Sequence, residues 1–358
     1  MKERNHAFDL LCGLCILRML MLHSISLCGF RGEFWFGKIM AWTFFFMSFF
    51  FFKAGYFNKT VAGNSWTYLK DKSKRLLVPY LAWGLIGSII YFGFVWGVGE
   101  HFEKAASRLT WAHVYRQSHF YGDPPCWFLV SFFMTYVVVH FVEKGLNKLR
   151  TMLEGAGWQQ SARTIQTMRI VSIAACPFVS FLLWKNKNPM WLSLNNVFMG
   201  IYFFYLGRLW RWLQTRVSKQ VIITLSVALI LCFITGNKLW HGEYDMSLNK
   251  FVQNPWGAGI NTTFALCGIS GLLLSLPIGR IPVVNYIGQH SMVYFVAHYP
   301  LIYFYKFTHQ AFGRAIWGHW DEWITLAVFI MAICTWLVPH VESVPWLSGR
   351  YKKVINQL

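Results

Sequence analysis

The feature that most constrains this sequence is a series of about ten apolar stretches, each roughly as long as a helix that crosses a bilayer. A backbone in lipid must satisfy its hydrogen bonds within its own segment, so we expect every stretch to be a helix. The sequence therefore predicts an all-α polytopic membrane protein with about ten transmembrane helices, formed by residues 1–358 as a single membrane-embedded domain. The predicted spans are 8–28, 34–57, 76–98, 125–142, 168–184, 189–207, 220–237, 257–279, 283–305 and 323–341.

Composition supports a membrane protein and argues against a nucleic-acid partner. Apolar residues make up 56% of the chain and charged residues only 13%, whereas a soluble domain carries about a quarter charged residues. The formal charge of +19 comes from Lys and Arg that fall between apolar stretches, which is typical of charge that sets membrane orientation. Membrane lipids are the partner that this composition predicts.

The distribution of basic residues between alternate loops predicts the orientation. One side collects about 20 Lys and Arg and the other about 11, so both termini are predicted to be cytoplasmic. The densest cluster, Lys70, Lys72, Lys74 and Arg75, follows the second span; it either marks topology or binds a ligand. The longest outside loop, 99–124, carries three histidines and either caps a site or is simply solvated.

Ionisable side chains within spans are costly and are therefore functional candidates. Arg18 and Lys53 either attract an anionic ligand or are satisfied by snorkelling and backbone carbonyls. His23 and His298 lie at similar depth in different spans, and each is either an acid or base or a hydrogen-bonded core residue. The candidates are Asp9, Arg18, His23, Lys53, His290 and His298.

Cys12 and Cys15 have the C-x-x-C spacing of redox pairs and metal sites. They lie inside the first apolar stretch, without a second pair and without a preceding strand, so we expect neither a redox site nor a bound metal. Most of the eight cysteines lie within apolar segments and are interpreted as small hydrophobic residues.

Six segments, in order along nearly the whole chain, resemble membrane acyltransferase family 3, which O-acylates cell-surface sugars and includes fucose 4-O-acetylase-like proteins. The opening helix of that family carries an acidic residue, a basic residue and then a histidine; Asp9 and His23 match its first and last members. The segments are FDLLCGLCILRMLMLHS (8–24), FFFFKAGYF (49–57), KSKRLLVPYLAW (72–83), CWFLVSFF (126–133), FFYLGRL (203–209) and YIGQHSMVYFVAH (286–298).

Two positions depart from the family pattern. The family usually has Arg, ten residues and then His, and here Cys12 stands where that Arg would precede His23. Ala54 replaces the Ser that usually precedes Gly, with Lys53 before it. The basic half of the motif is missing or relocated.

The resemblance implies an inner-membrane O-acyltransferase. It would move an acyl group, most simply acetyl, from cytoplasmic acyl-CoA to a hydroxyl of an envelope glycan or its lipid-linked precursor. Acetyl-CoA would be a co-substrate, with no permanently bound cofactor. His23 is the predicted base and His298 its assistant; the predicted substrate-binding residues are Asp9, Arg18, Lys53, Arg75 and Trp127. Two alternatives stay open: a transporter or flippase of a lipid-linked sugar, and a non-catalytic envelope-assembly protein.

Overall fold

The structure, a computed structural model, describes most of the chain as helices that form two compact units. Unit 1 comprises Met1–Phe46, Lys70–Val130 and Ile278–Leu358, and unit 2 comprises Met47–Leu69 and Ser131–Pro277. Both units are thus discontinuous in sequence. The described residues are 5–58, 64–97, 118–186, 190–240, 242–252, 254–277, 280–314 and 316–351.

Unit 1 is built around α1 (His6–Leu27), which packs against α12, α13 and α14. Asn5 caps the start of α1, because its side chain accepts hydrogen bonds from the backbone N–H groups of Ala7 and Phe8; such a cap satisfies donors that have no partner within the helix. The other elements are η1 (Phe30–Gly32), α2 (Phe34–Thr43), most of α4 (Ser65–Gly97), η2 (Pro124–Cys126), α12 (Pro282–Gln289), α13 (Ser291–Ala311), α14 (Trp320–Ser343) and α15 (Pro345–Ser348).

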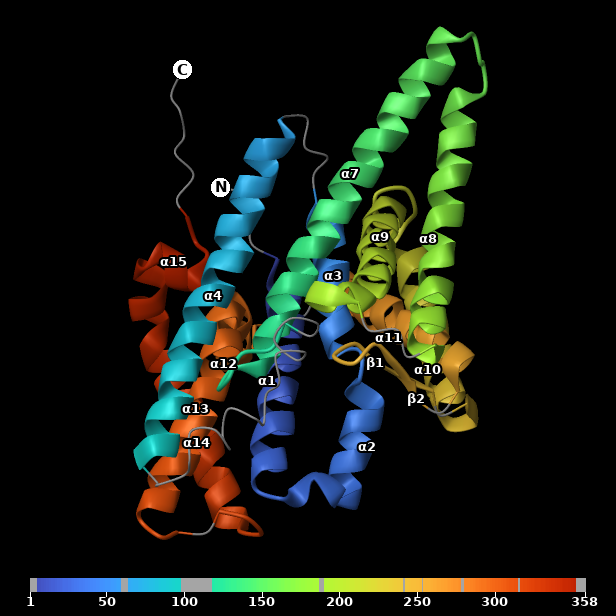
Figure 1. Cartoon of the computed structure of the whole chain (residues 1–358). Coiled ribbons are helices and arrows are strands. Elements are labelled where there is room, and N and C mark those ends of the chain that lie inside the picture. The colour runs from blue at the N-terminus through green and yellow to red at the C-terminus, as the bar shows by residue number, and fades with distance from the viewer. Residues whose placement is uncertain are drawn as a thin grey trace. The chain divides into compact units, whose positions relative to one another are not determined.

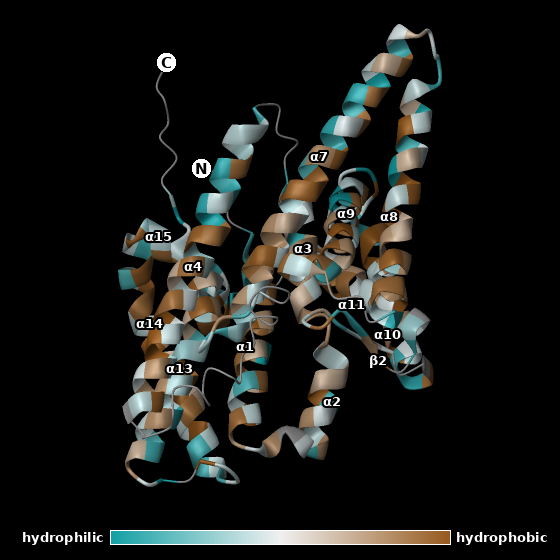
Figure 2. Cartoon of the chain, viewed as in Figure 1, coloured by the Kyte–Doolittle hydropathy of each residue, from teal (hydrophilic) through white to brown (hydrophobic). Residues whose placement is uncertain are grey.

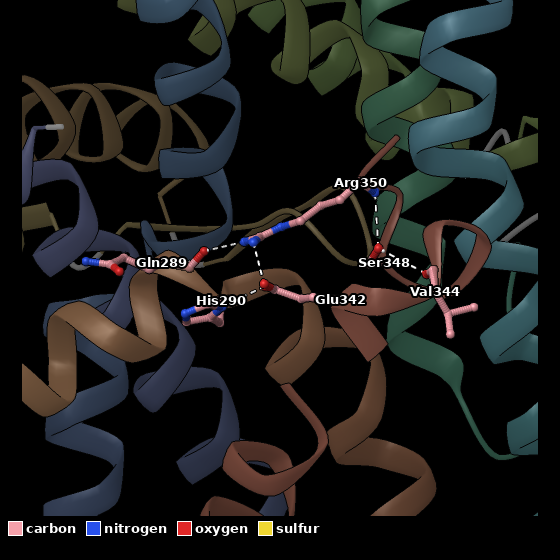
Figure 3. A network of polar contacts seen from close by, with 6 residues as sticks. All are labelled: Gln289, His290, Glu342, Val344, Ser348 and Arg350. Atoms are coloured by element: carbon pink, nitrogen blue, oxygen red, sulfur yellow. Dashed lines mark hydrogen bonds and ion pairs between the residues drawn. The ribbon is translucent and has the colours of Figure 1, made fainter. Parts of the chain in front are cut away.

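The predicted span 283–305 is divided into two helices, and His290 lies at the break. Figure 3 shows how the break is held: His290 Nδ1 lies 2.6 Å from Glu342 Oε1, and Arg350 pairs with the same carboxylate. Arg350 also donates to the carbonyl of Gln289 at 2.8 Å. The C-terminal segment therefore fastens the end of α14 to the α12–α13 junction.

Unit 2 contains the long antiparallel helices α7 and α8, joined by a short turn (Figure 1). Its antiparallel hairpin pairs Tyr244 with Phe251 and packs on α11, and α10 packs along α11. The elements are α3 (Phe46–Phe57), α7 (Trp127–Gly155, except its first turn), α8 (Ser161–Lys185), η3 (Trp191–Asn196), α9 (Val197–Gln214), α10 (Lys219–Trp240), β1 (Glu243–Asp245), β2 (Lys250–Val252) and α11 (Pro255–Ser275).

A buried carboxylate joins three helices of unit 2. Glu143 on α7 pairs with Arg169 of α8 at 2.9 Å and with Arg208 of α9 at 2.8 Å. Tyr205 donates a further hydrogen bond to it at 2.7 Å. A buried charge is tolerated when it is paired and hydrogen-bonded, and these three donors supply that pairing for the Glu143 carboxylate. The network therefore fixes the packing of α7, α8 and α9.

The predicted fold class is confirmed: the chain is an all-α polytopic membrane protein. In the part of the chain that the structure describes, eight helices are long and apolar enough to cross a membrane. The two remaining predicted spans correspond to η3 with α9, and to the broken pair α12 and α13. The predicted cytoplasmic location of both termini stays a prediction.

The predicted spans left 58–75 and 143–167 as loops between helices, and this prediction was partly wrong. Helix α4 begins at Ser65, so the basic cluster lies on a helix, and α7 continues to Gly155. Lys, Glu and Arg are good helix formers, so a helix continues beyond the apolar stretch. Figure 2 shows hydrophilic residues on α7 and α8 near the turn that joins them. Much of the predicted outside loop 99–124, including His101 and His113, lies outside the described residues.

Candidate active site

The structure brings His23 and His298 together within unit 1. His23 lies near the end of α1 and His298 lies in α13, and their ring centroids are 5.2 Å apart with the planes inclined by 33°. His298 is fully buried, whereas His23 is half-buried. Two imidazoles at this separation cannot easily both carry a proton, because like charges disfavour each other. An arrangement with at least one neutral ring is therefore favoured, and a neutral ring can accept a proton.

The hydrogen bond of His298 fixes its tautomer. Nδ1 lies 2.6 Å from the carbonyl oxygen of Phe295. A carbonyl only accepts, so Nδ1 carries the hydrogen in this assignment and the neutral ring presents a lone pair on Nε2. Within the described residues Nε2 has no hydrogen-bond partner, although it is buried. His298 is thus prepared to accept a proton or a hydrogen bond from a bound group.

Tyr299 completes the aromatic surroundings of the pair, and sequence reasoning missed it. Its ring meets His23 edge-on with centroids 5.1 Å apart and meets His298 edge-on at 5.7 Å. Its position directly after His298 could have pointed to it in the sequence, but a Tyr in an aromatic-rich helix is too common to be singled out. The site that the structure assembles therefore consists of two histidines and one tyrosine.

Asp9 lies at the opposite end of α1 from His23. The two residues are fourteen positions apart, which is about 21 Å along a helix axis. Asp9 is buried, and its backbone packs against Gly288 of α12. Cys12 is fully buried on the same part of α1. Neither residue therefore belongs to the histidine site, and the binding role predicted for Asp9 remains a prediction about a separate place in the fold.

Arg18 contacts the end of α2 and the segment that follows it. Its Nε donates to Thr43 Oγ1 at 3.3 Å, and its guanidinium lies over the ring of Phe46, 3.9 Å from the centroid. A cation over an aromatic face is stabilised by the negative face of the ring. Because Arg18 precedes His23 by five residues, it lies about 140° around the helix from that histidine. Arg18 thus faces away from the histidine pair.

The remaining predicted substrate-binding residues lie on helices other than α1 and α13. Arg75 on α4 forms an exposed ion pair with Asp71 one turn earlier, at 2.9 Å. Trp127 is buried at the start of α7. Lys53 is half-buried on α3 in unit 2. The structure thus brings the two predicted catalytic histidines together and places the five predicted binding residues on α1, α3, α4 and α7.

The comparisons with known proteins identify the family. The family model described as "Acyltransferase domain" matches residues 5–338, which is nearly the whole chain. Comparisons with curated proteins and with solved structures gave no match. The match covers the opening helix with His23 and the late helix with His298. The chain therefore belongs to membrane acyltransferase family 3 and is a multi-pass membrane acyltransferase.

Proposed function

We propose that the protein transfers an acetyl group from cytoplasmic acyl-CoA to a hydroxyl of an envelope glycan or its lipid-linked precursor, in the inner membrane. Family membership supports acyl transfer as the reaction. The observation that carries the proposal is the His23–His298 pair, with ring centroids 5.2 Å apart and a buried Nε2 on His298 that has no partner in the described part of the chain.

The pair matches the chemical need of the reaction. A sugar hydroxyl is a poor nucleophile, and a positioned neutral imidazole can accept its proton as the oxygen attacks the thioester carbonyl. A C–O bond forms, the C–S bond then breaks, and the imidazolium returns its proton to the departing thiolate. We assign the base to His23. His298 would orient the acceptor or stabilise the imidazolium, with its Nε2 lone pair directed by the hydrogen bond of Nδ1.

The proposed reaction is tested with the purified protein, labelled acetyl-CoA and a panel of hydroxyl acceptors that includes lipid-linked sugars. The expected result is release of CoA that depends on the acceptor, with the label recovered in an ester. A flippase would move the lipid-linked sugar across proteoliposomes without releasing CoA. Absence of ester and of CoA release with every acceptor would contradict the proposed function.

The donor site is expected to use other basic residues in place of the family's usual Arg, whose position is occupied here by Cys12. Acyl-CoA carries several phosphate charges, which fixed cations bind well. We expect that Arg75→Gln, and Arg18→Gln or Lys53→Gln, raise the acyl-CoA KM by about tenfold or more, since a hydrogen bond to a charged group is worth about 1.5–3 kcal/mol. The acceptor KM should change less. Steady-state kinetics at several salt concentrations measures both KM values. Salt should weaken donor binding most in variants that keep the basic cluster of Lys70, Lys72, Lys74 and Arg75 intact.

The matched control for the donor prediction is Arg150→Gln, because Arg150 forms a similar exposed ion pair with Glu154 one turn later, at 2.7 Å. This variant should leave both KM values unchanged. If all three Gln variants insert normally and bind acyl-CoA with unchanged affinity, the assignment of the donor site is wrong, and the cations serve topology and helix packing instead.

A further inference from the structure

The segment 118–126 of unit 1 carries two buried oxygen atoms that the catalytic proposal does not use. Asp123 and Ser118 are both fully buried. The Cys126 thiol donates to Asp123 Oδ2 at 2.7 Å. Neither Asp123 Oδ1 nor Ser118 Oγ has a hydrogen-bond partner among the residues that the structure describes. Buried polar atoms are normally paired, so two unpaired oxygens in one short segment point to a missing partner.

The backbone holds Asp123 in this position. Gly122 has φ +70°, and a Cβ on it would lie 2.0 Å from the carbonyl oxygen of Gly87 on α4. Asp123 N–H donates to the Phe120 carbonyl at 3.3 Å, and Ser88 Oγ of α4 donates to the Tyr121 carbonyl at 3.1 Å. Only glycine fits this close approach with a positive φ. The turn is therefore fixed against α4 and keeps the carboxyl group inside the unit.

The same segment reaches the histidine site. Helix η2, which directly follows Asp123, packs against α13. Tyr299 lies within electrostatic range of Asp123, and its ring contacts both His23 and His298. Tyr80 of α4 donates to the Ser118 carbonyl at 3.2 Å and lies within electrostatic range of Asp123. Tyr80 is thus a neighbour of both Asp123 and Ser118. Tyr299 is a neighbour of both Asp123 and the two histidines.

The chemistry of these atoms selects the kind of group that can join them. Burial raises the pKa of Asp123 well above its usual value, so the carboxyl group can either accept or donate a hydrogen bond. A phosphate or carboxylate would bring a negative charge into a fully buried place, which is strongly unfavourable without a paired cation. A hydroxyl both donates and accepts, and so fits Asp123 Oδ1 and Ser118 Oγ alike.

We propose that Asp123 and Ser118 form a binding subsite for a neutral hydroxyl group of the acceptor, beside the histidines and Tyr299. The proposal rests on the proposed function and deepens it. It makes the acceptor a polyol that presents at least two hydroxyls: one reacts at His23, and the other is held by Asp123. Asp123 is then a residue that binds and selects the acceptor and takes no part in the bond changes.

The test uses the full-length protein with acetyl-CoA, neutral p-nitrophenyl hexosides and their monodeoxy analogues. For the wild type, we expect that removing one particular hydroxyl lowers kcat/KM about tenfold or more, since a site built to bind a hydroxyl rejects an analogue without it. For Asp123→Asn, kcat/KM for the parent hexoside should fall by a similar factor, through a higher acceptor KM. With this variant, the same deoxy analogue should react with nearly the same kcat/KM as the parent hexoside. The acyl-CoA KM should not change.

Ser118→Ala provides a second variant, because removing an unpaired buried hydroxyl should not unfold the protein. It should also raise the acceptor KM, whereas a purely structural Ser118 would leave it unchanged. Glu154→Gln, at an exposed ion pair on α7, is the control and should behave like wild type. If the wild type acylates hexosides and both variants keep the wild-type acceptor KM and deoxy pattern, the subsite is wrong while the function stands. If the wild type acylates none of them, the proposed function itself fails.

Discussion

Replacing His23 with Gln is expected to lower acyl transfer by about 10²–10⁴-fold, the usual contribution of a general base. Gln keeps a polar group of similar reach but cannot accept a proton, so the rate loss would report the chemistry of the imidazole. Expression and the melting temperature should stay near the wild-type values, because the His23 ring is only half-buried. His23→Ala should also abolish transfer. Retention of more than about a tenth of the wild-type rate would rule out a general-base role.

Companion variants separate the roles of the two histidines. His298→Gln should also impair transfer, since it removes the lone pair on Nε2 that the hydrogen bond to Phe295 fixes. His140→Gln is the control: this histidine of α7 lies in unit 2, stacked on Tyr68 with centroids 4.4 Å apart. It should leave kcat unchanged. If His298→Gln lowers the rate of acyl transfer more than His23→Gln does, His298 and not His23 is the base.

The helices were predictable from hydropathy, because the need to satisfy backbone hydrogen bonds in lipid leaves few other solutions. The stretch 8–28 became α1 (His6–Leu27), and 323–341 lies within α14. Helix ends were less predictable. An apolar stretch marks where lipid begins and not where a helix ends, so the start of α4 at Ser65 and the extension of α7 to Gly155 were missed. The break at His290 was also missed.

The site was predictable only where it consists of ionisable side chains inside spans, because such side chains are costly there and stand out in the sequence. His23 and His298 were noticed for that reason and were predicted to lie at similar depth in different spans; that their rings meet is a finding of the structure. Asp123 escaped the same search because it lies in a segment between spans, where an acid is ordinary; only the fold shows that it is fully buried. Arg18 was noticed, but its contacts with Thr43 and Phe46 depend on how α2 packs, which no sequence pattern reports.

Gly288→Ala is expected to destabilise unit 1 by about 3 kcal/mol or more, the upper part of the range for overpacking. A Cβ on Gly288 would lie 1.7 Å from the carbonyl oxygen of Asp9. The contact is reciprocal, since a Cβ on Gly13 of α1 would lie 2.0 Å from the carbonyl oxygen of Val284 on α12. Small residues let membrane helices approach this closely, and the added methyl group must push the backbones apart. Thermal unfolding in detergent measures the loss.

The same variant should lower activity beyond what lost stability explains. Helix α1 carries His23 to His298 of α13, and a misplacement of about 1 Å can cost about 10²-fold in rate. The control is Gly145→Ala on α7, where nothing lies within 4 Å of the added Cβ. That variant should instead stabilise its helix by about 0.5–1 kcal/mol, the usual gain of Ala over Gly. Equal melting temperatures for Gly288→Ala and wild type would show that α1 and α12 are not in this close contact. The position of His23 would then have to be fixed by α13 and α14 alone.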